Sequence, residues 1–174
     1  MPLMQAEGEI VRFGEREATS RDFASFFAEE HARLFKALYF VAGNRADAAE
    51  LAQDAFLKLW ERWDRIGGID DPTAYLFRVA LNGFRMRARS ARRAAVRLVS
   101  ADPVADPFDE VELRDDVRRM LSTLAPRQRA ALVLLDLYGY PSDEAARIMG
   151  VRPSTVRALA SQGRAVLRGA GGRT

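Results

Sequence analysis

A single break in helical periodicity limits what this chain can fold into. The segment SADPVADPFDE, residues 100–110, combines two prolines with small and acidic residues. On both sides of it apolar residues recur with a period near 3.6, and no stretch alternates as a strand would. The sequence therefore predicts an all-α fold of two small helical domains, over 22–99 and 111–170, joined by a flexible acidic linker at 100–110. Residues 1–21 are polar, without a sustained period, and are predicted to form a loose lead-in.

The composition excludes several kinds of site. The chain has no cysteine and one histidine, His31, so neither a thiolate site nor a histidine-based metal site or triad is expected. No P-loop or dinucleotide-binding glycine motif is present, and we predict no enzyme activity, no metal and no cofactor. We find no signal peptide and no apolar run near the ~20 residues of a membrane span. The expectation is a soluble, cytoplasmic protein without a membrane partner.

Charge is distributed unevenly along the sequence. Residues 78–101 carry seven arginines and no acid, and residues 102–116 carry seven acids and one arginine. Residues 117–174 carry ten arginines and three acids. Two basic blocks separated by an acidic one indicate two contacts with a polyanion such as a nucleic acid.

The C-terminal segment SDEAARIMGVRPSTVRALASQGRAVLR, residues 142–168, predicts two helices with a tight turn between them. Ser142 is expected to cap the first helix, Gly150 to permit the turn, and Pro153 to start the second helix. The second helix has an expected inner stripe of Val156, Leu159, Ala160, Val166 and Leu167, and Gly163 is expected to allow close approach.

The opposite face of that second helix carries Arg157, Ser161, Arg164 and Arg168, spaced +4, +3 and +4. Arginines on such a face reach phosphates or base edges, and small neighbours let the helix enter a major groove. The pair is thus typical of a helix-turn-helix whose second helix reads DNA. An ordinary helical hairpin with a solvated arginine face is the alternative.

Three helices are expected before the linker. The first runs from about Asp22 to Gly43, the second from Arg45 to Asp64, and the third from Pro72 past Arg89, with Asp71 as its N-cap. The buried stripe of the second helix is expected to contain Ala48, Leu51, Ala52, Ala55, Phe56, Leu59, Trp60 and Trp63. Its other side carries an acidic stripe of Asp47, Glu50, Asp54 and Glu61, spaced +3, +4 and +7.

The order of these parts resembles one protein family. The stretches FFAEEHARLFKALYFVAGNRADAAELAQDAFLKLWERW and DPTAYLFRVALNGFRMRARSARR resemble region 2 of the extracytoplasmic-function class of bacterial RNA polymerase sigma factors. LSTLAPRQRAALVLLDLYGYPSDEAARIMGVRPSTVRALASQGRAVLR resembles region 4 of the same class. The resemblance implies a protein that binds core RNA polymerase, recognises the −10 and −35 promoter elements and helps to melt the duplex.

The resemblance also implies roles for particular residues. Docking on the β′ clamp of core polymerase, which the family contacts together with the β subunit, falls to Asp47, Glu50, Gln53, Asp54, Leu57 and Lys58. Recognition of the −10 element falls to Tyr75, Arg78, Asn82, Phe84, Arg85, Arg87 and Arg89. Recognition of the −35 element falls to Arg152, Ser154, Thr155, Arg157, Ser161, Arg164 and Arg168. Phe77 is expected in the core instead.

The sequence departs from the family pattern near Asn82. Leu81 replaces the usual arginine, and Gly83 stands where a larger residue is common. Further partners implied by the resemblance are promoter DNA and an anti-sigma protein. The acidic linker is interpreted either as a tether or as a nucleic-acid mimic. An autonomous helix-turn-helix regulator that binds operator DNA is the alternative function, and a protein-binding scaffold is a weaker one.

Overall fold

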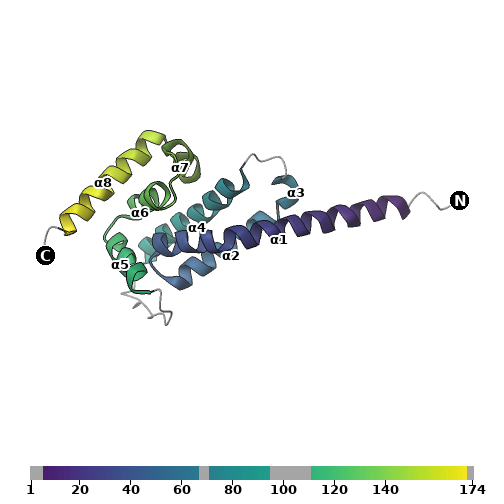
Figure 1. Cartoon of the computed structure of the whole chain (residues 1–174), viewed down its shortest axis with the longest axis horizontal. Helices are drawn as coiled ribbons and strands as arrows, with labels where there is room; N and C mark the ends of the chain where they lie inside the picture. The colour runs from purple at the N-terminus through teal and green to yellow at the C-terminus, as the bar shows by residue number, and fades with distance from the viewer. Residues whose placement is uncertain (1–5, 67–70, 95–110, 172–174) are drawn as a thin grey trace.

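The chain is built from helices arranged in two packed units (Figure 1). The computed structural model describes residues 6–66, 71–94 and 111–171, and every regular element in these ranges is a helix. The N-terminal unit contains α1 (Ala6–Ala42), α2 (Arg45–Trp60), α3 (Trp63–Ile66) and α4 (Pro72–Ala94). The C-terminal unit contains α5 (Val111–Ser122), α6 (Pro126–Leu132), the π-helical segment η1 (Val133–Leu137), α7 (Ser142–Met149) and α8 (Pro153–Gly171). The predicted all-α fold is confirmed, and the linker at 100–110 lies outside the described residues.

Helix α1 begins earlier than the sequence pattern indicated. The expected start was near Asp22 with a loose lead-in over 1–21, whereas α1 begins at Ala6 and its first turns extend beyond the other helices (Figure 1). Residues 6–21 contain four glutamates, three arginines and two alanines, which all favour helix. A helix already nucleated by packing at one end extends without an apolar stripe, because adding a residue costs much less than forming the first turn.

The core of the N-terminal unit lies between α1, α2 and α4. Phe77 is buried, as predicted, together with Leu34, Leu51 and Leu59. The Asp71 side chain accepts a hydrogen bond from the backbone N–H of Ala74 at 2.9 Å, which is the predicted cap of α4. The prediction that Trp60 is core is wrong: its side chain is 45% exposed, because α2 ends there and the ring lies over the edge of Phe23.

Gly83 marks a close approach between α4 and α2. A Cβ atom at this position would lie 3.3 Å from Cδ2 of Leu51, which is itself buried. The contact leaves little room for a side chain, which explains why this chain has glycine where a larger residue is common in the family that it resembles. The neighbouring Leu81 is buried and therefore serves packing rather than binding.

The C-terminal unit contains the predicted helix-turn-helix, formed by α7 and α8. Gly150 has φ of +64°, the left-handed conformation expected at the turn. Gly163 is buried against α6, where an added Cβ would lie 2.9 Å from Cδ1 of Leu132. Ser142 is the first residue of α7 and Pro141 takes the cap position, so the predicted Ser142 cap is wrong.

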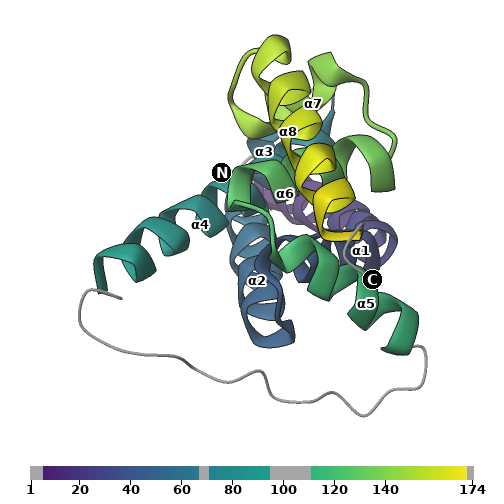
Figure 2. The same cartoon turned by 90° about the vertical axis from the view of Figure 1, so that its left-hand side faces the viewer.

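The inner stripe of α8 is shorter than predicted. Val156 and Ala160 are buried, and Leu159 and Leu167 are half-buried. Val166 is 42% exposed, because the last turns of α8 extend past α6 and have less to pack against. In Figure 2 the long axis of α8 runs across the end of the molecule, over α6.

The two units pack against each other: α4 contacts α7, and α1 contacts α5, α6 and η1. Arginines of the C-terminal unit bind backbone carbonyls where α1 ends. Arg129 donates to the carbonyl of Val41 at 2.9 Å, and Arg118 donates to that of Gly43 at 3.0 Å. These carbonyls have no partner within a helix that stops there, so the arginines satisfy them.

Candidate functional site

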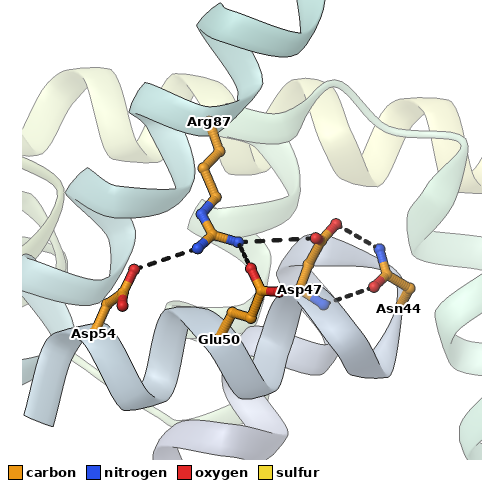
Figure 3. A network of polar contacts seen from close by, with 5 residues as sticks. All are labelled: Asn44, Asp47, Glu50, Asp54 and Arg87. Atoms are coloured by element: carbon orange, nitrogen blue, oxygen red, sulfur yellow. Dashed lines mark hydrogen bonds and ion pairs between the residues drawn. The ribbon is translucent and has the colours of Figure 1, made fainter.

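The acidic stripe predicted on α2 is a solvent-facing ridge, which we call the acidic ridge and define as Asp47, Glu50 and Asp54 (Figure 3). Asn44 fixes the start of α2: its side chain accepts from the backbone N–H of Asp47 at 2.8 Å and donates to the Asp47 carboxylate at 2.7 Å. The ridge is therefore built on a capped, rigid helix, as a docking surface requires.

Arg87 of α4 crosses to the acidic ridge. Its Nη1 lies 2.6 Å from Glu50 Oε2 and 3.9 Å from Asp47 Oδ1, and its Nη2 lies 3.2 Å from Asp54 Oδ2 (Figure 3). The hydrogen bond to Glu50 and the nearby carboxylates raise the pKa of the guanidinium above its ordinary value. Sequence reasoning grouped Arg87 with the −10 residues, and the structure places its side chain beside the acidic ridge.

The remaining predicted docking residues, Gln53, Leu57 and Lys58, are exposed on the same helix. Leu57 is 52% exposed and borders an apolar groove of about 700 Å³ between α1 and α2. The groove is lined by aromatic rings that include Phe27 and Trp60, and His31 stacks on Phe56 within it. An acidic surface and an apolar surface therefore lie next to each other on α2. This combination suits a partner that carries both cationic and apolar side chains.

Five of the predicted −10 residues form one stripe along α4: Tyr75, Arg78, Asn82, Arg85 and Arg89, spaced +3, +4, +3 and +4. Arg78 and Asn82 are exposed, and the Tyr75 hydroxyl accepts a hydrogen bond from Arg62 at 3.1 Å. A cationic face beside an aromatic ring suits an unstacked single strand. We call this stripe the α4 face. Arg87 lies nearly opposite it, since nine residues from Arg78 correspond to about two and a half turns.

The C-terminal half of the α4 face lies against the C-terminal unit. Arg85 donates to the carbonyl of Met149, the last residue of α7, at 3.4 Å. A cavity of about 690 Å³ lies between α4 and the helices α6 and α8, lined among others by Phe84, Arg85, Arg89, Met149 and Leu159. Phe84 is half-buried there, so three of the predicted −10 residues border the junction between the units.

The outer face of α8 is open to solvent. Arg152, Ser154, Arg157, Ser161, Arg164 and Arg168 are exposed, and Thr155 is half-buried. Arg164 forms a two-pronged pair with Asp136 of η1, at 3.0 Å from Nε and 2.5 Å from Nη2, which raises its pKa. No sequence pattern linked Asp136 to Arg164, because the two are 28 residues apart and the π-helical turn determines where Asp136 points.

Among the described residues, no helix is both long and apolar enough to cross a membrane. Within the same ranges, no group of three or more acidic or histidine side chains is placed to hold a metal ion.

Comparisons with known proteins agree with this geometry. The family model for sigma-70 region 2 matches residues 26–94, and that for sigma-70 region 4 matches residues 114–167. The ECF RNA polymerase sigma factor SigM of Mycobacterium tuberculosis is 30% identical over 146 residues, which cover 83% of this chain and 74% of the relative. The RNA polymerase sigma-E factor of Streptomyces avermitilis is 27% identical over 165 residues, covering 94% and 87%.

Solved structures share the fold. The sigma factor RpoE of Bartonella quintana, solved in complex with the anti-sigma factor NepR, superposes with a TM-score of 0.70 at 23% identity, over 85% of this chain and 95% of that one. The two family models together match well over half of the chain, in the order region 2 and then region 4. The chain therefore belongs to the sigma-70 family of RNA polymerase sigma factors, in its extracytoplasmic-function group.

Proposed function

We propose that this chain binds core RNA polymerase through α2 and directs it to promoters, using the α4 face for the −10 element and α8 for the −35 element. The observation that supports the proposal is that one chain presents three chemically different surfaces. An acidic ridge, a cation-rich helix with an aromatic neighbour and an exposed arginine face on a helix-turn-helix lie on three separate helices.

Docking is assigned to the acidic ridge and the residues beside it. The three carboxylates suit arginines of a partner, since planar guanidinium groups pair with carboxylates through two donors. The exposed Leu57 next to them supplies apolar contact that a purely electrostatic surface lacks. We expect the β′ clamp of polymerase to occupy this surface, together with Gln53 and Lys58.

Recognition of the −10 element is assigned to the exposed part of the α4 face. Asn82 is exposed between Arg78 and Arg85 and has a side-chain amide that donates and accepts hydrogen bonds. Melted DNA presents base edges that such an amide reads, while neighbouring arginines hold phosphates. The protein supplies no catalytic chemistry of its own in this scheme; bond formation belongs to the polymerase.

Recognition of the −35 element is assigned to the outer face of α8. Ser154 and Arg157 in its first turns, and Arg152 just before it, are exposed on the helix-turn-helix at the end of α8 where a recognition helix contacts base edges. Arg157 is exposed and free of any ion pair within the described part of the chain. An arginine in this state is available for phosphate or guanine contact without first breaking another bond.

Reconstitution tests the proposal. The purified chain is added to core polymerase, and the mixture is assayed for complex formation and for transcription from genomic fragments. D54R should weaken binding to core polymerase, since it places a cation on the ridge, while D64R makes the same change on an exposed residue of α3 and should leave binding unaltered. Failure of the wild-type chain to bind polymerase, combined with tight dimeric binding to an operator, would point to the autonomous regulator instead.

A further inference from the structure

We infer that the cavity between α4 and the helices α6 and α8 is a binding site for a free, single-chain fatty acid. The acyl chain fills the cavity, and the carboxylate pairs with arginines at its edge. The cavity has a volume of about 690 Å³. Small-molecule sites in proteins have volumes of about 300–1,000 Å³ and are mostly apolar, with a few polar groups that orient the ligand. The volume and the lining of this cavity both fit that description.

The inner part of the cavity is apolar. Leu81 of α4, Ala130 of α6 and Met149 of α7 line it, and each is only 6% exposed. Phe84 of α4 and Leu159 of α8 also line it and are half-buried. Aliphatic side chains offer no hydrogen bonds, and methionine adapts to irregular shapes. This lining therefore suits a flexible hydrocarbon chain.

The outer part of the cavity is cationic. Arg85, Arg89 and Arg127 line it, and both Arg89 and Arg127 are exposed to solvent. None of the described residues that line the cavity is acidic. Arginines without acids among them attract an anion, and a planar guanidinium matches a carboxylate through two donors. An apolar interior with cations at its edge thus complements an amphiphilic anion.

Two of these arginines have donors to offer to a carboxylate. Arg127, near the start of α6, takes part in no ion pair within the described part of the chain. Arg85 donates to the carbonyl of Met149 at 3.4 Å, and a guanidinium has five N–H donors in all. The two arginines come from different units, so a carboxylate at this edge is held from both sides of the cavity.

A nucleotide is a less suitable occupant. Its base needs aromatic rings for stacking and hydrogen-bonding groups for its edge. Among the described lining residues, Phe84 is the one aromatic side chain and Gln128 the one uncharged polar side chain. The Gln128 Oε1 already accepts from the backbone N–H of Ala125 at 3.2 Å, and its Nε2 donates to Gln162 at 3.5 Å. The cavity therefore has little with which to recognise a base.

A bound fatty acid also affects the proposed −10 surface. Phe84, Arg85 and Arg89 line the cavity and belong to the residues assigned to the −10 element. A carboxylate at the edge engages guanidinium groups that the phosphates of a single strand would otherwise contact. The fatty acid is therefore a competitor of melted promoter DNA. This consequence rests on the proposed function, whereas the binding itself does not.

Calorimetric titration of the full chain with decanoate tests the binding. We expect saturable binding, with an affinity that rises about fourfold for each methylene added between octanoate and decanoate, because each added CH₂ is removed from water. Decanamide has the same chain without the charge and should bind more weakly. An affinity that does not depend on chain length would overturn the inference. So would tighter binding of adenosine monophosphate than of decanoate, or binding of phosphatidylglycerol vesicles without binding of decanoate.

Three variants locate the site. R127Q removes a cation from the edge and should weaken decanoate binding several-fold without changing decanamide binding. R147Q makes the same change at an exposed arginine of α7 that does not line the cavity, and it should bind both ligands as the wild type does. A88F places a ring in the cavity from α4 and should weaken the binding of both ligands.

Equal losses of decanoate binding in R127Q and R147Q would mean general attraction to a basic protein, and would overturn the site. Circular dichroism establishes that each variant is folded. If A88F does not fold, the comparison of R127Q with R147Q decides the question, because both side chains are exposed and neither contributes to the core.

Competition with DNA is measured separately. Decanoate should weaken the binding of a short mixed-sequence single-stranded oligonucleotide to the wild-type chain, and the same concentration should have less effect on R127Q. Unchanged oligonucleotide binding at saturating decanoate would overturn the competition. If the wild-type chain supports no transcription with core polymerase, the proposed function fails, while the calorimetric result for decanoate still stands.

Discussion

Arg87 donates to Glu50 across the space between α4 and α2, with 2.6 Å between Nη1 and Oε2. The pair places a positive charge of the chain itself on the surface proposed to receive the positive charges of polymerase. Any basic group that docks on the acidic ridge therefore has to displace Arg87 or share the carboxylates with it.

Replacing Arg87 should strengthen docking. R87Q frees three carboxylates, and because exposed ion pairs contribute about 0.2–1 kcal/mol, we expect the dissociation constant for core polymerase to fall by a factor of about 1.4 to 5. Titration of labelled chain with core polymerase measures it. R65Q, which removes an exposed arginine from α3, should leave the constant unaltered, and an equal gain in both variants would mean that net charge, and not the ridge, is responsible.

Two arginines of α8 should differ in their effect on DNA binding. R157A should reduce the affinity for −35 duplex and lower the salt slope by about 0.9, since one phosphate contact is lost. R164A should do less, because Arg164 is already paired with Asp136 and has to leave that pair to reach DNA. Fluorescence anisotropy at several salt concentrations measures both. Equal losses would show that the Asp136 pair does not restrain Arg164.

Two glycines of α8 should respond in opposite directions to alanine. G163A forces a methyl group to within 2.9 Å of Leu132 Cδ1, and such overpacking costs about 1–3 kcal/mol, partly offset by the gain of about 1 kcal/mol in helix propensity. G169A meets no neighbouring atom within 4 Å, so only the propensity gain remains and stability should rise. Urea unfolding measures both. A stable G163A would mean that Leu132 moves aside at no cost.

Alkaline pH should destabilise the packing of Tyr138 against α1. Burial raises the pKa of Tyr138 from 10.0 to about 12, with the Arg33 guanidinium opposing this rise. A raised pKa contributes stability that is complete below the pKa of the solvated tyrosine, near 10, and is lost as pH rises through about 12. The free energy of unfolding, measured by urea titration at several pH values, should therefore decline over this range. Y138F should weaken the pH dependence, and an identical decline in Y138F would assign it to other groups.

Much of the fold could be predicted from sequence because it depends on local patterns. The buried stripe from Ala48 to Leu59, the Asp71 cap and the Gly150 turn each follow from spacing or from a residue's own conformational preference. Trp60 and Val166 were assigned to the core wrongly, because periodicity reveals neither where α2 ends nor how far α6 extends beside α8.

The side-chain contacts of the candidate site were harder to predict from the sequence. Arg87 fell within a basic block. Its spacing from Arg78 places it on the other side of α4, but the sequence does not reveal that the acidic residues of α2 lie on that side. The contact of Arg33 with Tyr138 and Tyr140 joins residues more than a hundred positions apart and depends on a π-helical turn. The assignment of individual residues to docking and to promoter recognition stays a prediction.

The contact between Arg129 and the end of α1 also affects how easily the units separate. Burial lowers the pKa of Arg129, and its Nε has no hydrogen-bond partner among the described residues. The packed junction thus retains a partly dehydrated cation, whose unpaired N–H would regain water once the Val41 carbonyl is released. Hydration of this one side chain works against the packing that holds the units together. The junction resembles a reversible protein–protein contact more than the interior of a single domain.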